Sequence, residues 1–180
     1  NHNPDPEKWS LKERPGWLRL KTGKPVSGLR EARNSLTQRP FAAYDGSLTH
    51  VETRMDISGM KDGDIAGLAM FQDPYAFIAV KQEAGLRNLI MVNNGKVIDA
   101  KPVKGNFIYF SCSASNVSGS ALFGYSTDNK TYLALGNELK MRFNLSVFTG
   151  NKFCLFNYST REQGGYVDVD WFRVQPINKK

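Results

Sequence analysis

Short runs of alternating apolar and polar residues, separated by turn residues, fill most of this chain. In residues 48–57, Val51, Thr53 and Met55 share one face, as a strand with one buried side requires. The sequence Asn93–Gly95 predicts a hairpin turn, because Asn and Gly accept positive φ. Further strands are predicted at 17–22, 67–71, 76–80, 89–92, 96–98, 106–112, 121–126, 130–133, 148–158 and 164–174.

Helical periodicity is weak throughout. The best stretch, 26–36, is short and is interrupted by Gly28. Many short strands with regular turn signals predict an all-β, antiparallel sandwich or barrel. The length of 180 residues suits a single domain over 1–180, and no internal linker is evident.

Charge and hydropathy exclude some partners. The formal net charge is +7, but Lys and Arg are scattered and no nucleic-acid-binding motif accompanies them. A solvated surface is the main interpretation, with weak attraction for acidic glycans or phosphates as the alternative. No apolar run approaches the roughly 20 residues that cross a membrane. We therefore expect neither a nucleic-acid partner nor a membrane partner. Cys112 and Cys154 are compatible with a bridge or with free buried thiols.

Catalytic patterns are scarce. There are two histidines, and His50 lies on a predicted strand without a surrounding motif. Asp168 and Asp170 are two residues apart, so a strand would direct both to one face. Three interpretations stay open: a glycosidase-like pair of acids, a calcium site, or a structural role in which Asp168 is exposed and Asp170 pairs with an arginine or backbone amides. The third acid of a glucanase strand is missing, since Phe172 occupies its place.

Aromatic side chains are candidates for stacking against sugars. Most aromatics on strands are core residues, so those near turns are the better candidates. We select Tyr75 and Trp9 on this ground.

Several segments, in order, resemble the C-terminal concanavalin A-like sandwich of glycoside hydrolase family 43 β-xylosidases and α-L-arabinofuranosidases. The resemblance covers nearly the whole chain. The segments are 1–5, 9–11, 14–20, 32–39, 62–68, 123–128, 148–150 and 164–172.

This resemblance implies a concanavalin A-like jelly roll that accompanies a catalytic five-bladed propeller, none of which is in these residues. The chain would be a non-catalytic accessory domain of an enzyme acting on xylan or arabinoxylan, with the propeller of the same polypeptide as partner. A start at Asn1 fits a fragment. A secreted or periplasmic location and a structural calcium ion at Asp168 and Asp170 are further expectations. The alternatives are a stand-alone lectin-like module and, less favoured, a sandwich-fold glycanase.

In that family a loop of the sandwich leans on the propeller and helps to close its pocket. The resemblance places this loop at residues 34–41. The residues expected to face the partner or its active site are Asn34, Leu36, Gln38, Arg39 and Phe41.

Overall fold

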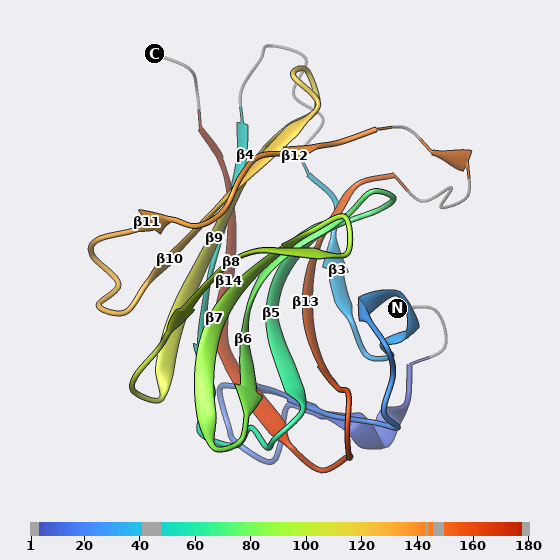
Figure 1. Ribbon diagram of the computed structural model, residues 1–180, viewed down its shortest axis with the longest axis vertical. Helices are drawn as coiled ribbons and strands as arrows, with labels where there is room; N and C mark the ends of the chain where they lie inside the picture. The colour runs from blue at the N-terminus through green and yellow to red at the C-terminus, as the bar shows by residue number, and fades with distance from the viewer. Residues whose placement is uncertain (1–3, 41–47, 143, 146–149, 178–180) are drawn as a thin grey trace.

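Two antiparallel β-sheets packed face to face form the described part of the protein (Figure 1). The structure is a computed structural model that describes residues 4–40, 48–142, 144–145 and 150–177. Within these ranges there is no α-helix, and therefore none long enough to cross a membrane. Two short 3-10 turns are present, η1 (Pro6–Lys8) and η2 (Leu29–Glu31). The predicted all-β sandwich is confirmed.

The larger sheet has eight strands in the order β1-β2-β14-β4-β9-β10-β11, with β12 also paired to β10. Their bounds are β1 (Trp9–Ser10), β2 (Leu18–Lys21), β4 (Leu48–Asp56), β9 (Phe107–Ser115), β10 (Ser120–Ser126), β11 (Leu133–Ala134), β12 (Leu139–Lys140) and β14 (Tyr166–Ile177). The smaller sheet has the order β3-β13-β5-β6-β7-β8. Its strands are β3 (Leu36–Gln38), β5 (Asp64–Phe71), β6 (Ala76–Glu83), β7 (Leu86–Asn93), β8 (Lys96–Pro102) and β13 (Lys152–Ser159).

The main core lies between the two sheets. Val51 and Met55 of β4 are fully buried there, as their alternation predicts, and Thr53 between them is equally buried. They face apolar side chains of the smaller sheet such as Leu68 and Ile78. Removing such side chains from water supplies the main driving force for this arrangement.

A second apolar cluster covers the outer face of the smaller sheet. Phe77 of β6 and Phe156 of β13 pack edge to face with their ring centroids 5.1 Å apart. Leu29 of η2 lies in the same cluster and is 1% exposed. The weakly helical stretch 26–36 is therefore an irregular cover that contains one 3-10 turn and ends at the first residue of β3.

Local turn chemistry decides two strand boundaries. Asn94 (φ 49°) and Gly95 (φ 77°) form the predicted hairpin turn between β7 and β8. The strand predicted at 130–133 is wrong in its first three residues, because the carboxylate of Asp128 accepts hydrogen bonds from the backbone N–H groups of Lys130 and Thr131. That turn leaves the two-residue strand β11 (Leu133–Ala134).

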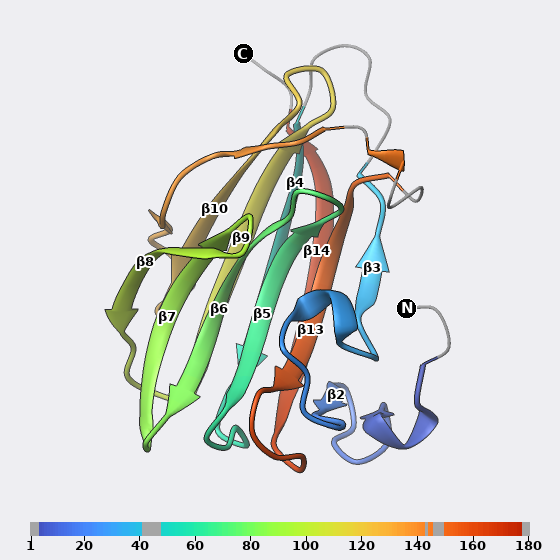
Figure 2. The ribbon, with the colours of Figure 1, turned by 45° about the vertical axis from the view of Figure 1, so that its right-hand side comes forward.

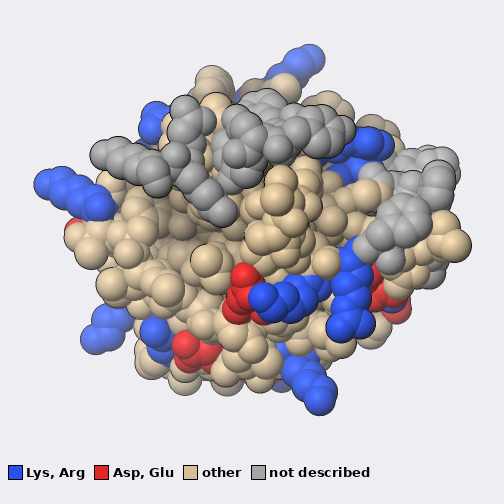
Figure 3. All heavy atoms as spheres, turned by 90° about the horizontal axis from the view of Figure 1, so that it is seen from above, with Lys and Arg blue, Asp and Glu red and all other residues tan. Residues whose placement is uncertain are grey.

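The cysteines are free thiols, one of the two states that the sequence allows, and the charged side chains are scattered over the surface as the sequence predicts. Cys112 and Cys154 are both free and buried, and burial raises the pKa of each thiol, to about 12 for Cys154. Seen from above, Lys and Arg side chains spread over the outline of the molecule, and Asp or Glu side chains lie next to several of them (Figure 3). On this face the cations do not gather into one patch.

Candidate functional site

An apolar groove lies at the edge of the sandwich, between residues of the N-terminal segment, β2 and β3. Figure 2 shows β3 and β2 at this edge, with the N-terminal segment beside β2. The volume of the groove is about 330 Å³. We call this hollow the apolar groove, and it is lined by Pro4, Trp9, Leu11, Leu18, Leu20, Asn34, Ser35 and Leu36.

Large apolar side chains of the groove are open to solvent. Trp9 is 42% exposed, Leu11 62% and Leu36 49%. A second hollow of about 450 Å³ adjoins it and shares Leu11, Leu18 and Leu36 with it. That second hollow extends the apolar surface to Trp171 and Phe172 of β14. Contiguous exposed apolar surface of this kind marks interaction sites in soluble proteins.

The predicted partner-facing residues divide between this groove and its surroundings. Leu36 lies on β3 and lines the groove. Asn34 also lines the groove, but its side chain is buried. Its amide oxygen accepts the backbone N–H of Asp5 at 2.7 Å, and its amide nitrogen donates to the Asp5 carbonyl. Gln38 and Arg39 are exposed beyond the groove.

The resemblance suggests that the segment 34–41 is a loop, but part of it is a strand. Leu36–Gln38 forms β3 and pairs with the edge of β13 over Phe153, Cys154 and Leu155. Phe41 lies outside the described residues. Trp9 and Leu11 reach the same groove from the N-terminal segment, and nothing in the local sequence around Leu11 signals this convergence.

Asp168 is a buried member of an ion-pair cluster, and the expectation that it is exposed is wrong. It is 2% exposed. Arg19 of β2 donates to both of its carboxylate oxygens, from Nε at 2.7 Å and from Nη2 at 2.8 Å. Arg14 donates to Asp168 at 3.1 Å and to Asp56 of β4 at 2.7 Å. Two arginines thus compensate two buried carboxylates that face each other across β14 and β4.

Asp170 follows the structural interpretation made from the sequence. Its carboxylate accepts a hydrogen bond from Arg54 at 2.8 Å, and both side chains are about a quarter exposed. A register shift between Val169 and Trp171 puts Asp170 in a β-bulge, so that Trp171 takes the position opposite Arg54. A bulge of this kind re-aims the side chains that follow it.

These carboxylates do not fit a calcium ion as they are arranged. Calcium binds 6–8 oxygen ligands, whereas the oxygens of Asp168 already accept hydrogen bonds from cationic guanidinium groups. No group of three or more His, Cys, Asp or Glu side chains with metal-binding geometry occurs among the described residues. The expectation of calcium at Asp168 and Asp170 is untested by these observations, and the ion pairs of both residues argue against it.

Tyr75 and His50 both have intramolecular partners. Tyr75 packs beside the second apolar cluster, stacked on Phe77 with a centroid distance of 6.2 Å, and does not line the groove that contains Trp9. The ring of His50 lies between the hydroxyl of Ser113, at 2.7 Å, and the carboxylate of Glu52, at 3.2 Å. Sugar stacking by Tyr75 and Trp9 stays a prediction.

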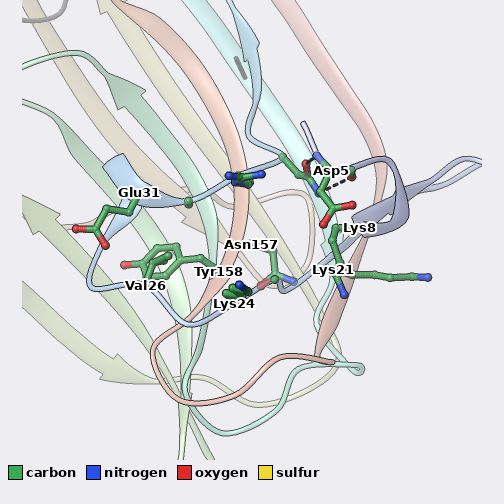
Figure 4. Close-up of a pocket in the computed structure, with 12 residues that line it drawn as sticks. Asp5, Lys8, Lys21, Lys24, Val26, Glu31, Asn157 and Tyr158 are labelled. Atoms are coloured by element: carbon green, nitrogen blue, oxygen red, sulfur yellow. Dashed lines mark hydrogen bonds between the residues drawn. The ribbon is translucent and has the colours of Figure 1, made fainter. Parts of the chain in front are cut away.

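A polar pocket of about 220 Å³ adjoins the apolar groove and shares Asn34 with it. Figure 4 shows the side chains that line this pocket. The pocket opens beside the start of β3, whose first residue, Leu36, pairs with Leu155 of β13. Just before this strand, Asn34 has φ 59° and directs the preceding chain away from the edge of β13. We call this hollow the polar pocket, and it is lined by Asp5, Lys8, Lys21, Gly23, Lys24, Val26, Glu31, Ala32, Arg33, Asn34, Asn157 and Tyr158. Sequence reasoning missed this pocket, because its residues come from four separate segments.

Two antiparallel sheets with this strand order define a concanavalin A-like sandwich, and comparison with known proteins places the chain more narrowly. Residues 1–175 match the β-xylosidase C-terminal concanavalin A-like domain. The chain belongs to this family. A β-xylosidase of Formosa agariphila is 31% identical over an alignment of 194 positions, which spans 96% of this chain and 32% of that protein.

Solved structures agree with the family. A bifunctional GH43-CE protein of Bacteroides eggerthii superimposes with a TM-score of 0.94 at 37% identity, over 99% of this chain and 23% of that one. An engineered GH43 glycoside hydrolase with endo-xylanase and exo-arabinofuranosidase activity gives a TM-score of 0.90 at 31% identity, over 99% and 38% of the two chains. The chain therefore corresponds to between about a quarter and two fifths of these longer enzymes.

Proposed function

We propose that this chain is a non-catalytic accessory domain of a glycoside hydrolase that degrades xylan or arabinoxylan. The parent would be a β-xylosidase or an α-L-arabinofuranosidase, secreted or periplasmic, since its polymeric substrate lies outside the cell. The observation that carries the proposal is the apolar groove, a surface suited to a permanent partner, on a domain whose relatives are parts of longer enzymes.

The occupant of the groove would be the catalytic domain of the same polypeptide. Leu11 and Leu36 are exposed to about half or more, which is unfavourable unless another surface covers them. Stable interfaces bury on the order of 800 Å² per partner, and the groove together with the adjoining hollow offers a continuous apolar strip. Aromatic anchors such as Trp9 and Trp171 are the residue types that dominate such interfaces.

The lack of a catalytic role is supported by the state of the carboxylates. A glycosidase needs one free acid and one free base or nucleophile at a defined separation. Asp168 and Asp56 are instead neutralised by Arg14 and Arg19. Burial raises the pKa of Asp56, but hydrogen bonds from Ser58 and Arg14 outweigh this and hold the pKa below its ordinary value, so Asp56 is not suited to act as an acid.

The test is association of this chain with the remainder of its polypeptide, produced separately and measured by calorimetry. Leu36→Asp and Leu11→Asp should weaken the complex at least tenfold by placing a charge in an apolar contact. Leu86→Asp is the matched control, since Leu86 is 68% exposed and lies on β7, away from the groove. Equal affinity of all three variants, or a polypeptide without a catalytic domain, would overturn the proposal and favour a lectin-like module.

A further inference from the structure

We infer that the polar pocket is a binding site for a uronic acid residue, one acidic sugar ring of a plant polysaccharide. The choice of a plant polysaccharide rests on the proposed function, whereas the choice of an acidic sugar rests on the residues of the pocket. The pocket is separate from the apolar groove, although Asn34 lines both.

The pocket has the size of one small ring. Its volume of about 220 Å³ lies below the roughly 300–1,000 Å³ of sites for drug-sized ligands. A polysaccharide backbone would not enter it lengthwise, but a single side residue of a branched chain would. The side groups of plant polysaccharides are of this size.

The charge of the pocket selects an anion. Within the described part of the chain, Lys8, Lys24 and Arg33 line it without an ion-pair partner. Lys21 is different, because its ammonium group is paired with Glu13, which does not line the pocket, and Figure 4 shows the Lys21 side chain extending away from it. Three unpaired cations around one small hollow favour a bound carboxylate.

Two carboxylates on the pocket wall, Asp5 and Glu31, offset part of this charge and leave one cation in excess among the unpaired groups. Glu31 accepts hydrogen bonds from the backbone N–H and the hydroxyl of Ser27. Asp5 accepts the backbone N–H of Glu7. Both carboxylates retain lone pairs that can accept sugar hydroxyls, which are donors that a simple anion lacks.

Asn157 supplies the second, independent observation. It is 4% exposed, and its amide nitrogen donates to the carbonyl of Leu20 at 2.9 Å. Its amide oxygen is buried and has no partner among the described residues. Figure 4 shows this side chain reaching from β13 toward the space between Lys21 and Lys24. A buried acceptor without a donor is unfavourable by about 1–3 kcal/mol, and a sugar hydroxyl would satisfy it once a small rotation of the amide exposed the oxygen to the pocket.

Tyr158 completes the wall with a donor. Its hydroxyl is protonated at neutral pH, as that of an ordinary tyrosine is, and burial raises the pKa further above its usual range. The pocket therefore combines cations for a carboxylate, carboxylate and amide acceptors for hydroxyls, and one phenol. Glucuronic and galacturonic acids carry both a carboxylate and several hydroxyls, whereas xylose lacks the carboxylate and phosphate lacks the ring of hydroxyls.

The experiment titrates the 180-residue chain with glucuronic acid, xylose and inorganic phosphate in turn, following amide chemical shifts by NMR. Glucuronic acid should bind at millimolar or lower concentration and shift the signals of Asn157 and Tyr158. Lys24→Met should weaken binding at least fivefold. Lys130→Met, an exposed lysine on the distant 127–131 turn, is the matched control.

Each other outcome overturns the inference. Equal binding of xylose, insensitive to Lys24→Met, would make the pocket a neutral-sugar site, and equal binding of phosphate would make it a general anion site. Absence of binding by all three probes would leave it without this function. The groove variants Leu11→Asp and Leu36→Asp should leave glucuronic acid binding unchanged, so failure of the docking proposal and failure of this inference are distinguishable.

Discussion

Asp168 and Arg19 form a two-point ion pair that joins β14 to β2, with Arg19 Nε 2.7 Å from one carboxylate oxygen and Nη2 2.8 Å from the other. The two residues are directly opposite each other in the sheet. The guanidinium of Arg19 also lies 3.9 Å from the ring centroid of Tyr166. The pair therefore holds β2 against β14. Because β1 of the N-terminal segment pairs with β2, the ion pair also supports the apolar groove that these segments line.

Asp168→Asn should lower the free energy of unfolding by about 3–5 kcal/mol, because the mostly buried Arg19 would keep only its longer contact with the exposed Glu13, at 3.3 Å. Asp170→Asn is the matched control. Its pair with Arg54 is about a quarter exposed, so its loss should cost about 0–1 kcal/mol. Urea denaturation of both variants provides the measurement. Similar losses for the two variants would contradict the structural role assigned to Asp168.

The contrast between these two aspartates shows what the sequence can and cannot predict. The alternation of Val51 and Met55 identifies a buried face, because period and burial are local properties of a strand. Asp168 is different, since its partners Arg14 and Arg19 are 154 and 149 residues away in the chain. The bulge at Asp170 has no local glycine signal either, so the spacing of the two acids did not predict their surroundings.

The candidate sites follow the same division. The sequence indicates Trp9 as a stacking candidate and the family resemblance indicates Leu36 as a partner-facing residue, and the structure brings both to one groove. The polar pocket depends on the left-handed conformation of Asn34, which separates the chain from the edge of β13. Asn accepts this conformation more readily than most residues, but the sequence does not reveal which Asn adopts it.

Removal of calcium should leave the melting temperature unchanged, because the negative charges of Asp56, Asp168 and Asp170 are already met by arginines. The measurement compares melting with a chelator and with millimolar calcium. A ligand that binds the native state alone would raise the melting temperature with concentration. A rise with calcium that is lost in Asp170→Ala would establish the ion.

Gly67→Ala should be strongly destabilising, by about 3 kcal/mol, because β5 and β6 approach each other closely at this residue. A Cβ atom there would lie 2.1 Å from the carbonyl oxygen of Ile78 and 2.6 Å from Cα of Ala79, both backbone atoms that cannot move aside. Gly23→Ala is the control, since an added Cβ meets nothing within 4 Å there. It should change stability by less than about 0.5 kcal/mol. Thermal melting that ranks the two variants alike would contradict this account.

The contribution of Asp64 to the free energy of unfolding should decrease as pH rises. Burial raises the pKa of this carboxyl, and hydrogen bonds from the backbone N–H of Lys61 and from Ser159 only partly offset the effect. Between the unfolded pKa, about 3.9, and the higher folded pKa, the folded state binds more protons than the unfolded state. The contribution of Asp64 to stability is therefore fully present below the unfolded pKa and is lost as pH rises through the folded pKa.

Asp56 contributes to stability with the opposite pH dependence, because its folded pKa is lowered. Its contribution is present above the unfolded pKa and is lost on acidification through the folded pKa.

Comparison of the natural chain with Asp64→Asn isolates the pH dependence that comes from Asp64. The variant should gain stability relative to the natural chain as pH is raised from 3 to 7. Urea denaturation at several pH values measures this difference, with an unchanged m-value as the control for an unaltered fold. A difference that is constant over the whole pH range would show that Asp64 titrates alike in both states.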